Sequence, residues 1–219
     1  MIQFSSTFAE LDQFLSGATT TLCVALLSAL FGLGVGFGLL LLRTGRWAPL
    51  QWLARLYLSF VRGTPLLVQI FLIYYALPGL VGIDLPPFSA GVIALSLNSG
   101  AFASEILRGG LSAIPRTQFD AAQALGLSPF DEWFRVILPQ LARLILPPML
   151  NELVLLVQGS ALLSVISVVD LTRAAQNVMN ATYRPFEALT SAAFIYFIGL
   201  FALSHGTRAL RRKVPVARS

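Results

Sequence analysis

The sequence predicts an all-α integral membrane protein with about five transmembrane helices. Of the 219 residues, 56% are hydrophobic and only 11% are charged, and the mean hydropathy is +0.77. This composition is too apolar for an ordinary soluble domain. Several apolar runs also reach the roughly 20 residues that a helix needs to cross a hydrocarbon core about 30 Å thick.

Each apolar run is a candidate membrane span. Small hydroxyl residues supply almost all of the polar side chains in the first run. The fourth run is long and contains Pro147 and Pro148, and because proline removes a backbone donor, we expect a functional bend there. The five predicted spans cover residues 15–42, 53–80, 88–111, 137–169 and 186–203.

The basic residues predict the orientation of the chain. Thirteen of the fifteen Lys and Arg residues fall after the first and third spans or at the end of the chain, whereas only Arg173 and Arg184 fall on the other side. Basic residues in short loops stay in the cytoplasm. We therefore expect the N-terminus outside, the C-terminus inside and a basic cytoplasmic tail over residues 207–219.

The first 14 residues contain no Lys or Arg, and the apolar run that follows is too long for a cleavable signal peptide. We expect this segment to be retained. Phe4, Phe8, Leu11 and Leu15 recur at helical spacing, as a helix lying in the membrane interface would require.

Residue counts exclude several kinds of chemistry. One cysteine, Cys23, and one histidine, His205, cannot form a disulfide, a multi-Cys/His metal site or a Cys-His catalytic pair. Lys213, the only lysine, is followed by Val214, so no phosphate-binding loop is present. From these counts we expect no cofactor on this chain. We also expect no nucleic-acid partner, because membrane topology already explains where the basic residues lie.

Glycines recur in the first span. Gly32 with Gly36, and Gly34 with Gly38, have the small-xxx-small spacing that lets two helices approach closely in a membrane. We predict a tight helix–helix contact along this run.

Residues 112–136 form the longest polar interruption on the predicted inner side, and two short helices are expected in it. The first covers residues 117–125 and ends at Gly126, a residue suited to a left-handed cap. Ser128 has the properties of an N-cap for the second helix, with Pro129 at its first position and Asp131 in its first turn.

This loop is unusually apolar for a segment in water. Its large side chains would either form a protein interface or fold back against the membrane ends of the helices, and local pattern does not separate these interpretations. The residues are Phe119, Leu125, Leu127, Phe130, Trp133 and Phe134.

The same loop carries a family resemblance. Residues 118–128, together with VILPQ at 136–140, resemble the EAA loop of binding-protein-dependent ABC transporter permeases. Four further stretches resemble the polar amino acid branch of this family. They are RGTPLLVQ at 62–69, the cluster of Glu105, Arg108, Gly109 and Gly110, LPPMLNE at 146–152, and LLSVISVVDLTR at 162–173. The resemblance covers about residues 15–190.

The resemblance implies one permease domain, residues 1–219, in a bacterial inner membrane. It implies an importer that moves a polar amino acid by alternating access. The expected partners are a dimer of a separate ATPase that uses ATP and Mg, a second permease subunit (a homodimer or a related chain), a periplasmic or surface substrate-binding protein, and membrane lipid. The chain itself would then be a transport subunit and not an enzyme.

By the same resemblance, the loop docks as a coupling helix into the ATPase. Asp120 stands where the family usually has Glu, which keeps the charge. The expected coupling residues are Gln118, Asp120, Ala121, Ala122, Leu125 and Gly126.

Polar side chains inside spans usually face a pathway or a partner. Glu105 is expected to pair with Arg108 at i, i+3 spacing. The family typically has Lys-Asp-Thr-Ser-Leu where this chain has residues 158–162, so two charges are missing and Glu152 is a candidate replacement. The path candidates are Asn98, Asn151, Glu152, Gln158 and Ser160.

Two alternatives belong to other classes. An ion-coupled secondary transporter or channel would need coupling-ion or filter residues and usually internal repeats, which the sequence does not show. A membrane enzyme would need a convergent catalytic set.

Overall fold

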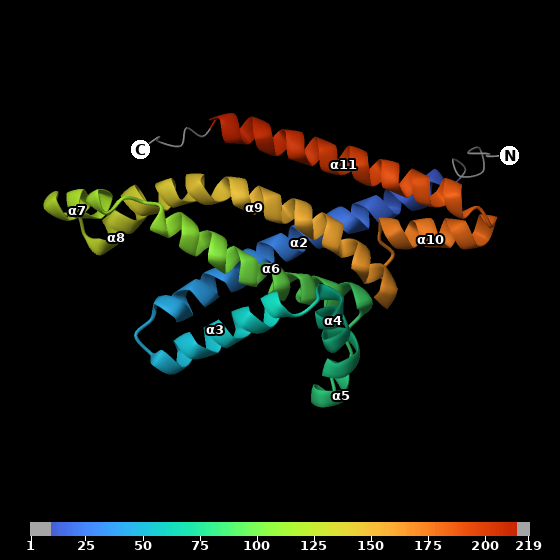
Figure 1. Cartoon of the computed structure of the whole chain (residues 1–219), viewed down its shortest axis with the longest axis horizontal. Helices are drawn as coiled ribbons and strands as arrows, with labels where there is room; N and C mark the ends of the chain where they lie inside the picture. The colour runs from blue at the N-terminus through green and yellow to red at the C-terminus, as the bar shows by residue number, and fades with distance from the viewer. Residues whose placement is uncertain (1–9, 214–219) are drawn as a thin grey trace.

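A computed structural model describes residues 10–213, with side chains for residues 10–206, and every regular element within this range is helical (Figure 1). The predicted interfacial helix at Phe4 and Phe8 and the end of the predicted basic tail, residues 214–219, lie outside the described residues. The elements are α2 (Leu11–Thr44), α3 (Ala48–Gly63), α4 (Leu66–Phe71), the π-helix η1 (Leu72–Ala76), α5 (Leu77–Val81), α6 (Pro87–Ser112), α7 (Arg116–Ala124), α8 (Pro129–Asp131), the π-helix η2 (Glu132–Ile137), α9 (Leu138–Ser160), the 3-10 helix η3 (Ala161–Ile166), α10 (Leu171–Thr182) and α11 (Pro185–Lys213).

Four helical runs in the described part of the chain are long and apolar enough to cross a membrane: Leu11–Thr44, Pro87–Ser112, Pro129–Ile166 and Pro185–Gly206. They match the first, third, fourth and fifth predicted spans. The second predicted span, residues 53–80, is not one continuous helix. That segment divides into Ala48–Gly63 and Leu66–Val81, which meet at an angle of 113°.

Pro65 explains the break. A proline disfavours the helical conformation of the residue before it, and Thr64 is extended, with φ −119° and ψ 145°. Pro147 and Pro148, by contrast, lie inside α9 without ending it. The expected bend there does not interrupt the helix; the chain turns after η3, where Ser167 adopts a left-handed φ of 68°.

Helices α2 and α6 lie side by side through the middle of the molecule (Figure 1), and two glycines of α2 bring them together. A Cβ added at Gly32 would lie 3.0 Å from the Ser99 Cβ, and one added at Gly36 would lie 2.7 Å from the Ala103 Cβ. Among the described residues no atom lies within 4 Å of a Cβ added at Gly34 or Gly38. The predicted close contact is therefore confirmed for Gly32 and Gly36, whereas Gly34 and Gly38 contact no other helix among the described residues of this chain.

The remaining helices cover this pair. α9 packs on α6 and α2, α11 packs on α9 and α10, and α3 packs against α2 and α6. α2 begins near the right-hand end of the molecule in Figure 1, and α11 runs from that end toward the other, as five crossings would require if the bent pair counts as one span. The predicted orientation, with the N-terminus outside, agrees with this arrangement and stays a prediction.

Large apolar side chains cover much of the outer surface. Leu26, Leu30, Phe194 and Phe197 are each more than half exposed. Such an apolar surface is stable where lipid or another membrane protein, and not water, covers it.

Candidate functional site

Local sequence signals shape the loop between α6 and α9. The N–H of Leu127 donates to the Ala122 carbonyl at 3.1 Å, and the N–H of Gly126 donates to the Gln123 carbonyl at 2.9 Å. This is the Schellman pattern, which needs a left-handed residue after the helix. Gly126 supplies it with a φ of 69°, so the predicted cap is confirmed.

The second predicted helix begins where expected but does not end as a separate element. The Ser128 hydroxyl accepts a hydrogen bond of 3.1 Å from the Asp131 N–H and donates one of 2.8 Å to the Asp131 carboxylate. Asp131 also pairs with Arg135 at 2.8 Å, one turn on. From Pro129 the helical run continues through η2 and α9 to Ile166. The second helix of the loop and the fourth span are therefore one helical run, whereas α7 is separated from it by the turn at Gly126.

Five of the six predicted coupling residues are exposed. Ala122 is the exception, at 2% exposure, because it faces inward. Gln118 accepts a hydrogen bond of 3.2 Å from the Gln140 side chain of α9, which joins the two helices. The exposed five are Gln118, Asp120, Ala121, Leu125 and Gly126.

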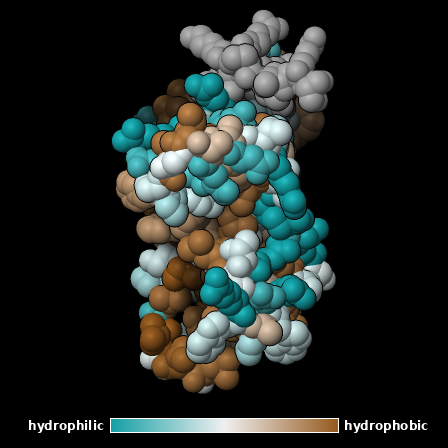
Figure 2. Space-filling model, turned by 90° about the vertical axis from the view of Figure 1, so that its left-hand side faces the viewer, coloured by the Kyte–Doolittle hydropathy of each residue, from teal (hydrophilic) through white to brown (hydrophobic). Residues whose placement is uncertain are grey.

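Some aromatic residues of the loop fold back against the helices, and others remain exposed, as a protein interface would require. Phe119 packs inward against the buried cluster of Ile114, Ile137 and Leu141. Phe130 and Phe134 stack on each other with ring centroids 4.3 Å apart and stay exposed. Figure 2 shows this end of the molecule, where hydrophilic residues gather around hydrophobic ones.

In the middle of the fold, one predicted path residue meets a residue that sequence reasoning missed. The Asn98 side-chain amide on α6 donates to the Gln69 side-chain oxygen on α4 at 3.0 Å. Gln69 is buried and donates in turn to the Val61 carbonyl at 2.8 Å and to Thr64, across the break before α4. An amide within the apolar run RGTPLLVQ was the signal that could have found it.

Glu152 contacts the residue that follows Asn98 in the chain. It is 8% exposed on α9, and the Ser99 side chain on α6 hydrogen-bonds its carboxylate. The neighbours Asn98 and Ser99 thus bring α4, α6 and α9 together. A carboxylate within a span, with a neutral partner, is costly and is typical of a functional position.

The other path candidates do not join this group. Asn151 and Gln158 are exposed on another face of α9. Ser160 is fully buried, and its hydroxyl donates to the Val157 carbonyl of its own helix at 2.9 Å. The five candidates therefore divide into the partly buried Asn98 and the buried Glu152, an exposed pair, and one residue bonded within its helix.

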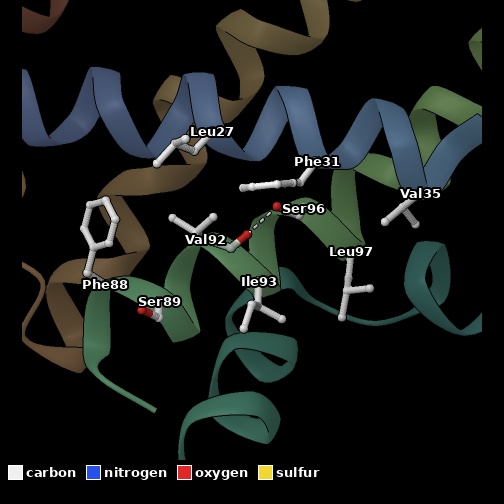
Figure 3. A pocket seen from close by; sticks show the side chains of 9 residues that line it. All are labelled: Leu27, Phe31, Val35, Phe88, Ser89, Val92, Ile93, Ser96 and Leu97. Atoms are coloured by element: carbon white, nitrogen blue, oxygen red, sulfur yellow. Dashed lines mark hydrogen bonds between the residues drawn. The ribbon is translucent and has the colours of Figure 1, made fainter.

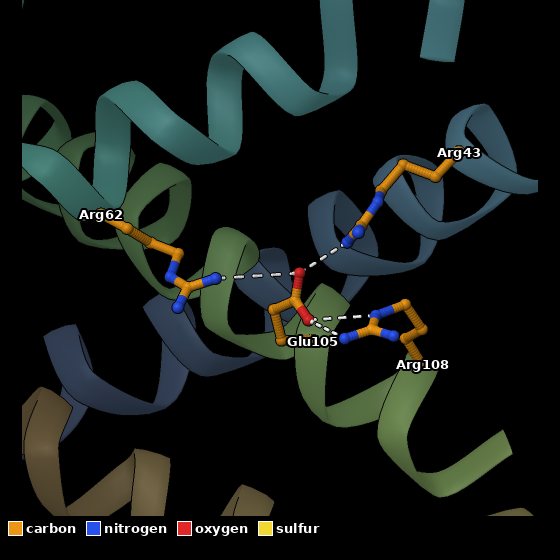
Figure 4. Close-up of polar contacts among 4 residues, drawn as sticks. All are labelled: Arg43, Arg62, Glu105 and Arg108. Atoms are coloured by element: carbon orange, nitrogen blue, oxygen red, sulfur yellow. Dashed lines mark hydrogen bonds and ion pairs between the residues drawn. The ribbon is translucent and has the colours of Figure 1, made fainter. Parts of the chain in front are cut away.

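Glu105 lies at the other end of α6 in an ionic cluster (Figure 4). The predicted pair with Arg108 is confirmed at 2.8 Å. Arg43 from the end of α2 approaches the same carboxylate at 2.6 Å, and Arg62 from the end of α3 lies 3.9 Å from it. Three helix ends thus meet at one carboxylate, which spacing along the chain did not reveal.

An apolar cavity of about 480 Å³ opens between α2 and α6 (Figure 3). Leu27, Phe31 and Val92 line it, and the hydroxyl of Ser96 donates to the Val92 carbonyl at 2.6 Å. No charged side chain is among its lining residues in the described part of the chain. It is therefore suited to apolar contacts.

Comparison with known proteins gives this geometry a context. The chain is 38% identical to the arginine transport system permease protein ArtQ of Bacillus subtilis, over 97% of both chains. It is 39% identical to the putative glutamine transport system permease protein GlnP of Rickettsia conorii, over 91% of this chain and 92% of that one.

A solved structure described as an amino acid ABC transporter with histidines superposes with a TM-score of 0.90 at 36% identity, over 97% of this chain and 99% of that one. The MetNI methionine ABC transporter shares the fold, with a TM-score of 0.76 at 19% identity, over 93% of this chain and 97% of that one. Residues 28–214 match the model of the binding-protein-dependent transport system inner membrane component. The chain belongs to that family.

Proposed function

We propose that this chain is the permease subunit of an ATP-driven importer for a polar amino acid. The observation that carries the proposal is similarity over nearly the whole chain, in sequence and in fold, to permeases named for arginine and glutamine and to an amino acid ABC transporter. The alternatives, an ion-coupled secondary transporter or channel, find no support in these relatives.

In this proposal the surface of α7 and its cap, defined by Gln118, Asp120, Ala121, Leu125 and Gly126, docks on a separate ATPase. Because α8, η2 and α9 form one helical run, a force applied beside α7 would reach the fourth span directly. ATP and Mg act in the partner subunit, and this chain contributes movement and not hydrolysis.

The substrate path in this proposal passes the group of Asn98, Gln69 and Glu152. Among the described residues, the buried carboxylate of Glu152 has a neutral hydroxyl, that of Ser99, as its one hydrogen-bond partner. It can therefore accept hydrogen bonds from a substrate ammonium group. The amides of Asn98 and Gln69 supply polar groups that suit a zwitterion. Asn151 and Gln158 would line the path only where a second permease subunit encloses it.

The assembly that fits is a pair of permease subunits, identical or related, with an ATPase dimer and an external substrate-binding protein. The chain would act as one domain over residues 1–219 in the inner membrane of a bacterium. The predicted orientation puts α7 in the cytoplasm, where ATP is available.

Affinity purification from gently solubilised membranes tests the coupling. Ala121→Trp places a bulky side chain on the exposed surface of α7, and Ala181→Trp is the matched control on an exposed alanine of α10, at the far end of the molecule (Figure 1). We expect an ATPase to co-purify with the wild type and with Ala181→Trp, and not with Ala121→Trp.

An absence of any ATPase from the wild-type sample would overturn the importer proposal. Equal recovery of the ATPase with both variants would show that it does not dock on this surface of α7. Uptake of radiolabelled amino acids into vesicles, with unlabelled amino acids as competitors, then identifies the substrate class; a lack of saturable, ATP-dependent uptake of every amino acid would contradict it.

A further inference from the structure

A polar pocket opens at the meeting point of α2, α3 and α6. Its volume is about 600 Å³. Arg43, Arg55, Arg62 and Glu105 supply its charged lining, and Ser59 and Gly63 complete its polar part. No described atom lies within 4 Å of a Cβ added at Gly63, so the pocket is open above the end of α3.

The charges around this pocket do not balance. Among the described residues, Glu105 is the only carboxylate that lines the pocket, against three arginines, and Arg108 binds that carboxylate from outside the pocket. Glu105 holds Arg43 at 2.6 Å, but Arg62 lies 3.9 Å away, beyond hydrogen-bond length. The side chain of Arg62 is 53% exposed, and no other partner for it occurs among the described side chains.

The remaining arginine of the pocket is also weakly held. Arg55 donates one long hydrogen bond, of 3.3 Å, to Gln51. Each guanidinium presents five N–H donors in a planar fork that fits two oxygens of a phosphate. Arg55 and Arg62 therefore retain donors and positive charge that face an open pocket.

The position of the pocket points to lipid as the source of the phosphate. Trp47 and Trp52, at the start of α3, are 70% and 64% exposed, as aromatic residues at a membrane–water interface often are. Beside them, Leu41, Leu42 and Leu50 line a largely apolar groove of about 280 Å³ at the α2–α3 corner, which Arg46 and Trp47 also line. Basic pockets between spans, next to apolar surface, bind the headgroups of anionic lipids.

We propose that this pocket binds the phosphate of an anionic phospholipid headgroup, held by Arg55 and Arg62 with Arg43 behind them. The acyl chains would then lie against the apolar surface beside α3. The bound lipid would neutralise the excess positive charge around Glu105 and tie the ends of three helices together. This proposal does not depend on the transported substrate or on the ATPase.

Tryptophan quenching by brominated lipid tests the proposal on the full-length chain reconstituted in vesicles. Trp133→Phe removes the signal of the third tryptophan, which leaves Trp47 and Trp52 as reporters. Brominated phosphatidylglycerol in phosphatidylcholine is compared with brominated phosphatidylcholine alone. Arg55→Gln and Arg62→Gln are the test variants, and Arg143→Gln removes the same charge at an exposed position of α9 that lines neither the polar pocket nor the groove.

We expect selective quenching by phosphatidylglycerol that weakens about fivefold in each test variant and stays unchanged in Arg143→Gln. Equal loss in all three variants would mean general surface attraction and would overturn the site. Quenching without lipid preference, together with saturable binding of inorganic phosphate by the wild type, would overturn the lipid assignment. A thermal melt of each variant confirms that it is folded before it is compared.

Discussion

Asn98 on α6 donates a hydrogen bond of 3.0 Å to the side chain of Gln69 on α4. The contact fixes the first turn of α4 to a central helix at the point where the chain turns through 113°. Gln69 also donates to carbonyls on the far side of the break, at Val61 and Thr64. One buried amide thus satisfies the backbone groups that Pro65 leaves open.

Gln69→Leu should therefore destabilise the fold and reduce transport. The substitution leaves the amide of Asn98 and the carbonyl of Val61 without these partners, which we expect to cost about 2 kcal/mol. Thermal unfolding in detergent measures the loss. Gln51→Leu, which removes an exposed hydrogen bond to Gly45, is the control. Equal melting temperatures for the two variants would contradict this role.

Gly36→Ala and Gly34→Ala should differ sharply although the residues are two apart. A Cβ at position 36 would lie 2.7 Å from that of Ala103, so α2 and α6 must separate, at a cost of about 1–3 kcal/mol. No described atom lies near a Cβ at position 34, where alanine should be neutral or slightly stabilising. Similar melting temperatures would show that the helices can separate without cost.

Gly126→Ala should weaken the junction between α7 and α8. No described atom obstructs the added methyl group, so its effect comes from the left-handed φ of 69° and amounts to about 1–2 kcal/mol. Gly109→Ala, at a helical position with equally open space, is the control. Co-purification of the ATPase should fall for Gly126→Ala alone; unchanged recovery would show that cap geometry does not matter for docking.

Glu152→Gln should reduce amino-acid uptake by roughly tenfold or more, because it removes the charge available to a substrate ammonium group. Glutamine keeps the shape of the side chain and can still accept a hydrogen bond from Ser99. Ser160→Ala should retain near-normal uptake, since that hydroxyl bonds within its own helix. Normal uptake by Glu152→Gln would remove this residue from the path.

Asp170 caps α10, between the spans that end at Ile166 and begin at Pro185. It accepts hydrogen bonds from the N–H of Arg173 at 2.9 Å and from the Tyr196 hydroxyl at 3.3 Å. Burial raises the pKa of this carboxyl above its usual value, although these hydrogen bonds oppose the effect. Its contribution to stability is therefore largest at acidic pH and is lost as pH rises through the raised pKa.

Asp170→Asn should accordingly flatten the dependence of melting temperature on pH between the ordinary pKa of aspartate and neutrality, because asparagine caps a helix nearly as well. Asp170→Ala should lose about 1 kcal/mol of stability at acidic pH, where the wild-type side chain contributes most, since it removes the cap. A pH profile of Asp170→Asn that is parallel to the wild type would contradict the role of burial.

Short-range signals account for what the sequence predicted well. Four of the five spans follow from the length of apolar runs, because a bilayer imposes one thickness on every helix. The cap at Gly126 and the N-cap at Ser128 follow from residues within a few positions of each other. The break at Pro65 had the same kind of signal, but the long apolar run around it favoured one continuous span.

By itself, the sequence determined the membrane class, the spans, the loop caps and the family resemblance, because each depends on neighbouring residues or on a motif. Only the tertiary structure decided that Gly36 and not Gly34 contacts α6, that Ala122 faces inward, and that Arg43 and Arg62 join Glu105. These contacts depend on which faces of distant helices meet. The faces that meet are selected when the whole chain packs together. Helical periodicity shows which residues share a face of one helix, but it does not show which other helix that face contacts.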